Sequence, residues 1–117
     1  MTGNTFLTVK LLKLYCYRQE ENDGDEVYMR YNDQRLWPKK EKYCKMDKGE
    51  VTINAKIKNI KNNEVLSIEL WDYDVISRDD KLGLFTMLVD EKGGPFRTDM
   101  LADNEHGAKY SLEWEVS

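Results

Sequence analysis

Four aspartates lie close together in this 117-residue chain, at positions 72, 74, 79 and 80. An apolar segment ends just before Asp72, and the next one begins at Leu82. Four carboxylates on one short loop repel each other unless a positive charge lies among them. Asp72 and Asp74 are two residues apart, so in an extended chain both side chains point to the same side. Ca²⁺ takes about six to eight oxygen ligands from such loops, and the segment therefore predicts a site for a hard cation.

A second acidic segment, residues 18–26, contains five carboxylates and one glycine. A segment with this composition cannot form part of a core. Both acidic segments are expected at strand ends, and the loops of a β-sandwich cluster at its two ends. The two segments can therefore meet around one space, where their carboxylates would need counter-charge.

The aspartate loop does not follow the EF-hand pattern. With Asp72 at position one and Asp74 at position three, position five is Ile76, position six is Ser77 and position twelve is Gly83. The oxygen ligand, the glycine and the bidentate glutamate of the EF-hand are all missing. A metal in this chain must therefore be held by two separate loops.

Other site chemistries find little support in the sequence. One histidine, His106, and two distant cysteines make a zinc site improbable. Residues 93–95, Gly-Gly-Pro, lack the lysine and serine of a phosphate-binding loop. No nucleophile, histidine base or cofactor motif accompanies the carboxylates, so we expect no catalysis. We expect Cys16 and Cys44 to be free thiols, although the sequence leaves a pairing between them open.

Hydrophobic periodicity predicts strands and no helix of any length. Residues 6–17 alternate with strand period, but the parity slips by one at residues 11 and 12, which predicts a β-bulge. Further strands are predicted at residues 27–32, 34–37, 51–58, 65–71, 82–89 and 110–116. A tight turn is predicted at residues 32–33. Residues 90–109 are predicted to be irregular, with one helical turn near residues 99–103. These seven or eight short strands predict an all-β, eight-stranded antiparallel β-sandwich forming a single domain, residues 1–117.

The aspartate loop resembles the third-loop signature of the C2 domain, the calcium- and phospholipid-binding β-sandwich. That signature has two aspartates two residues apart, a third six residues later, and Leu-Gly or Ile-Gly two residues further on. Asp72, Asp74, Asp80 and Leu82-Gly83 fit this spacing. The family's first calcium loop ends in Asp-Pro-Tyr, and residues 26–28 of this chain read Glu-Val-Tyr instead.

The resemblance implies a Ca²⁺ site built from both loops. Its main ligands would be Asp72, Asp74 and Asp80, with the carbonyl of Tyr73 or Asp79 also available. The expected metal-binding set is Asp72, Asp74, Asp80, Asp79, Glu26, Asp25 and Asp23. Glu20 is an alternative to Asp23, and the number of ions stays open.

The resemblance also implies a partner, either an anionic phospholipid membrane or another protein. Val75, Ile76 and Arg78 at the loop tip would contact the bilayer. The lysines Lys39, Lys40, Lys56 and Lys58 form either a basic face for lipid headgroups or a solvated face that balances the acidic end. The alternative function is a calcium-independent protein-interaction or structural domain.

Charge and hydropathy limit the remaining possibilities. The formal net charge of −4 argues against general nucleic-acid binding. No apolar run approaches the ~20 residues of a membrane-spanning helix, and the first residues lack the pattern of a secretion signal. We therefore expect a cytoplasmic protein, monomeric, with peripheral attachment to a membrane where the partner is lipid.

Overall fold

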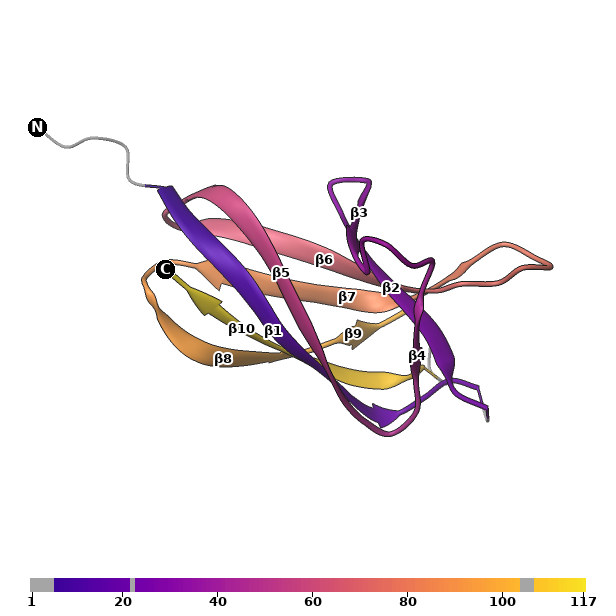
Figure 1. Cartoon of the computed structure of the whole chain (residues 1–117). Coiled ribbons are helices and arrows are strands. Elements are labelled where there is room, and N and C mark those ends of the chain that lie inside the picture. The colour runs from indigo at the N-terminus through magenta and orange to yellow at the C-terminus, as the bar shows by residue number, and fades with distance from the viewer. Residues whose placement is uncertain (1–5, 22, 104–106) are drawn as a thin grey trace, which may run out of the picture.

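The computed structural model describes residues 6–21, 23–103 and 107–117, and within them the regular structure is entirely β (Figure 1). The strands are β1 (Phe6–Arg18), β2 (Asp25–Tyr31), β3 (Gln34–Trp37), β4 (Cys44–Met46), β5 (Gly49–Lys61), β6 (Glu64–Asp72), β7 (Asp80–Val89), β8 (Gly93–Asp99), β9 (Leu101–Ala102) and β10 (Lys109–Val116). All of the strand pairs are antiparallel. The predicted all-β antiparallel sandwich is therefore confirmed.

The strands form two sheets that face each other. One sheet has four strands in the order β5-β1-β10-β8. The other has the order β3-β2-β6-β7-β9, and β4 also pairs with β2. Sheet order and not chain order therefore decides which loops are neighbours, because β1 and β10 come from opposite ends of the chain but pair along most of their length.

The predicted bulge in β1 is confirmed. The register of β1 shifts between Leu11 and Lys13 against both of its neighbours, β5 and β10. Against β10, β1 has one extra residue at this position, which lets Leu11 and Leu14 both point inward, and both are fully buried. The bulge thus explains how a strand with slipped parity still contributes one continuous apolar face.

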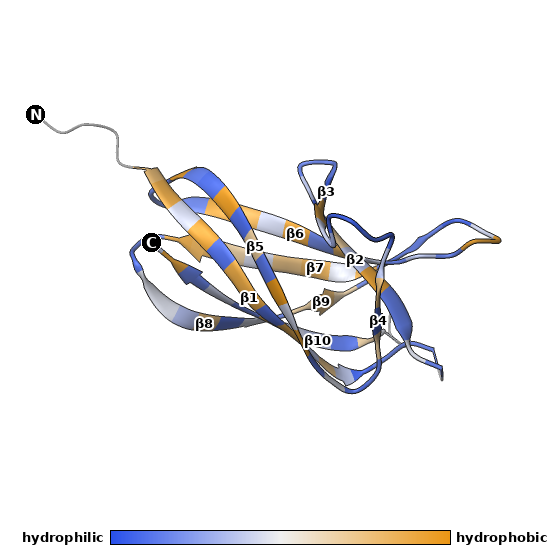
Figure 2. Ribbon diagram, in the orientation of Figure 1, coloured by the Kyte–Doolittle hydropathy of each residue, from blue (hydrophilic) through white to orange (hydrophobic). Residues whose placement is uncertain are grey.

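Alternation along β6 and β7 fills the core between the sheets. Leu66, Ile68 and Leu70 of β6 are buried, as is Phe85 of β7. Figure 2 shows the apolar positions along these strands as separate bands between polar ones. A sheet with one solvated face and one buried face requires alternate burial of this kind along each strand.

The predicted tight turn between β2 and β3 is also confirmed. Asn32 and Asp33 have φ values of 51° and 62°, in the left-handed region. Positive φ at both central residues is the geometry of the type I′ hairpin turn, and Asn and Asp tolerate it better than other non-glycine residues.

The prediction for residues 90–109 was wrong in part. Residues 93–99 and 101–102 of this segment form β8 and β9, and the expected helical turn near residues 99–103 is absent, because Leu101 and Ala102 pair with β7. Nearly all side chains of β8 are exposed at the edge of the four-stranded sheet. An edge strand with no buried face shows no hydrophobic alternation, so periodicity could not reveal it.

Candidate functional site

The two acidic loops meet at one end of the sandwich, as expected from their positions at strand ends. Val27 of β2 lies opposite Asp72 of β6, so the β1–β2 loop ends where the β6–β7 loop begins, and both loops project from the same end of the sandwich (Figure 1). The backbone amide of Glu26 donates a hydrogen bond to Oδ1 of Asp72 at 2.8 Å. The Tyr73 amide donates in turn to the Glu26 carbonyl at 2.7 Å. The sheet register therefore fixes the bases of both loops against each other.

Asp72 lies at the junction of the two loops with only 6% of its surface exposed. Burial raises the pKa of its carboxyl from 3.8 to about 7. The Glu26 amide opposes this shift, but the carboxylates of Asp25, Glu21 and Glu20 add to it. A pKa near neutrality is typical of a buried carboxyl whose neighbours are acids and not cations.

The ion pairs in the described part of the chain do not neutralise Asp72 or the acids around it. Their acidic partners are Glu50, Glu69 and Glu113, which lie elsewhere on the two sheets. Asp72 and Asp80 are also directly opposite each other in the pairing of β6 with β7. Two like charges opposite each other destabilise a sheet unless a cation separates them.

Asp25 has a different environment from Asp72. It is fully buried, and its carboxylate accepts hydrogen bonds from the amides of Glu20 and Glu21 at 3.0–3.1 Å and from the Tyr110 hydroxyl at 2.7 Å. These bonds tie the β1–β2 loop to β10. Sequence reasoning missed this role, because no local pattern relates Asp25 to Tyr110. As a metal ligand Asp25 stays a prediction, with its oxygens already engaged by the protein.

Hydrogen bonds within the β6–β7 loop organise its aspartates. Oδ1 of Asp74 accepts from the amides of Ile76 at 2.8 Å and Ser77 at 3.2 Å, and Oδ2 accepts from the Ser77 hydroxyl at 2.8 Å. These three donors lower the pKa of Asp74. Asp79 accepts from the Asp74 amide at 2.9 Å and from the Tyr28 hydroxyl. The loop therefore has a defined shape that its own side chains maintain.

The acidic side chains at this end have the right chemistry for a hard cation, but they are not arranged around a common point. The carboxylates of Asp72, Asp74, Asp80 and Glu26 are oxygen ligands of the kind Ca²⁺ prefers. No group of three acidic, histidine or cysteine side chains in the described residues converges as a metal site. Asp74 would have to exchange the Ser77 hydroxyl for an ion. Asp23 and Asp80 are exposed, and Glu26 is partly buried.

The tip of the β6–β7 loop carries two highly exposed aliphatic residues. Val75 is 80% exposed and Ile76 is 94% exposed, and Arg78 beside them is also exposed. Figure 2 shows this apolar tip at the far end of a loop that projects beyond the sheets. Two adjacent aliphatic side chains with this degree of exposure are typical of an interaction site.

An aromatic pair that the sequence did not single out lies at the base of the same loop. The rings of Tyr43 and Tyr73 stack with centroids 5.3 Å apart, and Nζ of Lys42 lies 5.9 Å from the Tyr73 ring centre. Tyr43 belongs to the lysine-rich connection between β3 and β4. This contact joins a third loop to the acidic end, and only the tertiary structure reveals it.

The four lysines of the predicted basic face lie in the β3–β4 connection and on β5. Lys39 and Lys40 line a cavity of about 320 Å³ with Trp37 and Ile53. Lys56 and Lys58 are exposed on β5. Their role in headgroup binding stays a prediction.

Three further expectations concern the thiols, the histidine and membrane-spanning helices. Cys16 and Cys44 are free thiols, as expected. His106 lies outside the described residues. No helix in the described part of the chain is long and apolar enough to cross a membrane.

Comparison with known proteins identifies the fold. No protein-family model matches the chain, and no curated protein does so either. Among solved structures, a C2 domain of a plant extended synaptotagmin 1 matches 99% of this chain and 95% of its own length, with a TM-score of 0.64 and 16% identity. A C2 domain-containing protein matches 100% of this chain and 93% of its own, with a TM-score of 0.61 and 18% identity.

A third match is part of a much larger protein. Human GIVD cytosolic phospholipase A2 covers 95% of this chain with a TM-score of 0.59 and 15% identity, but the match spans only 16% of that protein. At identities this low the likeness establishes the fold alone. The chain has the C2 fold, and its predicted resemblance to C2 domains is confirmed at the level of the fold.

Proposed function

We propose that this chain is a non-catalytic module that docks on an anionic phospholipid membrane through the β6–β7 loop, with Ca²⁺ as its cofactor. The observation that carries the proposal is the position of Val75 and Ile76, which are highly exposed at the tip of a loop whose aspartates, Asp72, Asp74, Asp79 and Asp80, take part in no ion pair within the described residues. The location that goes with this function is the cytoplasm, with peripheral attachment to a membrane.

The apolar tip alone gives only weak membrane affinity. Full burial of one aliphatic side chain of this size contributes about 1.5–3 kcal/mol, and the loss of motional freedom on docking offsets much of the contribution from two. The carboxylates below the tip repel an anionic surface within a Debye length of about 8–10 Å. Docking therefore requires that the local charge be reversed.

The residues that would hold the ion are Asp72, Asp74, Asp80 and Glu26, with Asp79, Asp25 and Asp23 as further candidates. Ca²⁺ supplies positive charge at the base of the loop when bound. Asp72 and Asp80 supply the opposed carboxylates, and Asp74 supplies a third once it releases Ser77. Arg78, close to the tip, adds a fixed positive charge for the lipid phosphates.

Calcium titration calorimetry and vesicle co-sedimentation test the proposal. Asp74→Asn and Asp80→Asn should each weaken Ca²⁺ binding and calcium-dependent binding to phosphatidylserine vesicles. Asp90→Asn is the matched control, because Asp90 is an exposed aspartate in the β7–β8 connection, away from the acidic loops. An absence of heat and of thermal shift at millimolar Ca²⁺ in the unaltered protein would overturn the calcium part of the proposal.

Substitution of the loop tip tests docking separately from metal binding. The double variant Val75→Ser, Ile76→Ser should lose vesicle binding and keep its Ca²⁺ affinity, because the bond from position 76 to Asp74 comes from the backbone amide and is retained. Val65→Ser is the control, since Val65 is a 58% exposed valine on the outer face of β6. Equal vesicle binding by the tip variant and the control would contradict the proposal.

A second candidate function has one observation in its favour. The bonds of Asp74 to Ser77 and of Asp79 to Tyr28 shape the loop without a metal. A loop with a fixed shape can bind a protein or membrane partner independently of calcium. Vesicle binding that persists in a chelator and in Asp74→Asn would support this candidate over the first.

A further inference from the structure

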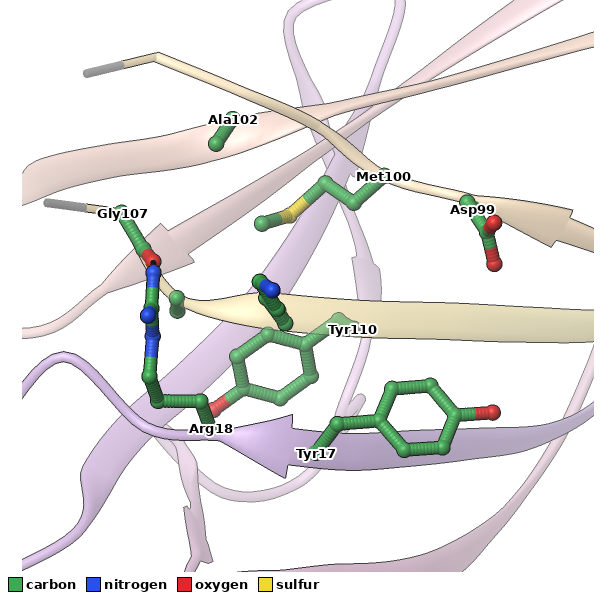
Figure 3. Close-up of a pocket in the computed structure, with 9 residues that line it drawn as sticks. Tyr17, Arg18, Asp99, Met100, Ala102, Gly107 and Tyr110 are labelled. Atoms are coloured by element: carbon green, nitrogen blue, oxygen red, sulfur yellow. Dashed lines mark hydrogen bonds between the residues drawn. The ribbon is translucent and has the colours of Figure 1, made fainter. Parts of the chain in front are cut away.

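A cavity of about 620 Å³ lies on the side of the sandwich where β1 ends and β10 begins (Figure 3). Arg18 and Lys109 line it together with the tyrosines at positions 17 and 110. Met100, from the segment that crosses between β8 and β9, closes another wall. This volume falls within the range of about 300–1,000 Å³ that is usual for small-molecule sites.

Two cations oppose each other at this cavity. Arg18 and Lys109 are direct partners in the antiparallel pairing of β1 with β10. Like charges at directly opposite positions destabilise a sheet. Neither residue takes part in an ion pair within the described part of the chain, where Arg18 donates a hydrogen bond from Nη2 to the Gly107 carbonyl at 2.8 Å. An anion between the two side chains would remove the repulsion.

Two acids of the neighbouring strands are engaged with protein donors. Asp99, on the cavity wall, accepts the Ser111 hydroxyl at 2.7 Å. Asp25 lies behind Tyr110 and accepts its hydroxyl, along with two backbone amides. The guanidinium of Arg18 has five N–H donors, and its bond to Gly107 leaves most of them for a ligand.

The rest of the lining favours a ligand with an apolar part. Met100, Ala102 and Ala108 present aliphatic atoms, and the Tyr110 ring lies beside Arg18 (Figure 3). Tyr110 is buried with its hydroxyl turned to Asp25, so the ring contributes its face and not its polar end. The cavity thus combines an apolar wall with two cations that form no ion pair among the described residues.

We propose that this cavity binds the phosphate group of an amphiphilic molecule between Arg18 and Lys109, with the apolar body of the ligand against Met100 and Ala102. The phosphate can come from a membrane phospholipid or from a soluble phosphate ester. The choice of a lipid rests on the proposed membrane docking, because the same end of the sandwich carries the β6–β7 loop (Figure 1). The anion site itself rests only on the paired cations and the cavity.

The test uses titration calorimetry with a short-chain phosphatidic acid below its micelle concentration, in the presence of chelator. The unaltered protein should bind this monomeric lipid, and Arg18→Gln and Lys109→Gln should each lower the affinity about tenfold or more, as the loss of a charge-assisted hydrogen bond predicts. Lys92→Gln is the matched control, because Lys92 is an exposed lysine in the β7–β8 connection. Thermal unfolding of each variant checks that the fold persists, and Lys109 is exposed, so its substitution is well tolerated.

Inorganic phosphate and short-chain phosphatidylcholine complete the experiment. Weaker binding of both supports a phosphate monoester on an amphiphile. Equal affinity for inorganic phosphate would overturn the apolar part of the proposal, and unchanged lipid affinity in Arg18→Gln and Lys109→Gln would overturn the site. Monomeric lipid binding does not require vesicle docking. Loss of vesicle binding alone would therefore contradict the proposed function and leave the cavity proposal standing.

Discussion

Two buried carboxylates at the acidic end differ in how their charge is stabilised. Asp25 accepts hydrogen bonds from two amides and one hydroxyl, and Asp72 accepts one from an amide. Hydrogen bonds to the charged form stabilise it, whereas burial near other acids destabilises it. Asp25 therefore acts as a structural anchor, and Asp72 carries the excess charge that a cation could neutralise.

Removal of the Tyr110 hydroxyl should destabilise the fold through Asp25. In Tyr110→Phe the buried carboxylate loses its donor from β10 and keeps its two amide donors, and the loss of one hydrogen bond to a charged group costs about 1.5–3 kcal/mol. Urea unfolding of the variant measures this loss. Tyr17→Phe is the control, because Tyr17 is 49% exposed and its hydroxyl accepts a bond from Arg97 at the surface. Equal stability of the two variants would show that Asp25 does not depend on Tyr110.

The raised pKa of Asp72 predicts how stability depends on pH in the metal-free protein. The unfolded carboxyl titrates near 3.8 and the folded one near 7, so the folded state binds the proton more tightly. This contribution to stability is complete below about pH 4 and is lost as the pH rises through 7. Asp72→Asn should therefore raise the melting temperature at pH 8 in chelator more than it does at pH 5, since the amide oxygen can still accept the Glu26 N–H.

Scanning calorimetry of the protein and of Asp72→Asn at several pH values checks this expectation. Asp90→Asn, at an exposed position, should shift the melting temperature little at any pH. If Asp72→Asn instead lowered the melting temperature at pH 8, the carboxylate would have to be stabilised by a cation or donor at that pH.

At the scale of elements, the close packing of β7 against β9 shapes the start of β7. Gly83 of β7 lies opposite Ala102. A Cβ at position 83 would collide with the Leu101 carbonyl oxygen and with the Met100 side chain. Glycine at this position is therefore required by the approach of a neighbouring backbone, and the Leu-Gly of the loop signature has a structural reason independent of calcium.

Gly83→Ala should destabilise the protein by about 1–3 kcal/mol, because the backbone of β9 must move to admit the methyl group. Denaturant unfolding measures the change. Thr86→Ala provides the comparison on the same strand, since Thr86 is exposed and its substitution leaves the core unchanged. Unchanged stability of Gly83→Ala would mean that β9 packs less tightly against β7 than the structure indicates.

At the scale of the whole molecule, the two thiols lie in different environments. Cys16 is buried in the core and Cys44 is partly exposed at β4. Burial raises the pKa of both thiols, so little thiolate is present at neutral pH. The sandwich thus holds together by packing and hydrogen bonding, with both thiols free.

Alkylation should therefore modify Cys44 slowly in the native protein and Cys16 only after unfolding. Mass spectrometry after brief treatment with iodoacetamide, with and without urea, measures this order. Reducing agent should leave the melting temperature unchanged. A lower melting temperature in reducing agent would show that the thiols pair in solution.

The sequence by itself determined the strands with a buried face and the two acidic loops. Alternation in β5, β6 and β10 reports burial directly, because a strand between core and solvent must alternate. The aspartate spacing indicated the C2 resemblance, and the fold bears it out. These features are local, so a linear pattern contains them.

Only the tertiary structure decided which residues share a space. The pairing of β2 with β6 placed Asp72 against Glu26, and the pairing of β1 with β10 placed Arg18 opposite Lys109. The tertiary structure also revealed the β8 edge strand, whose exposed side chains show no hydrophobic periodicity. Such contacts join residues far apart in the chain, and their register depends on how both sheets pack, which no local pattern specifies.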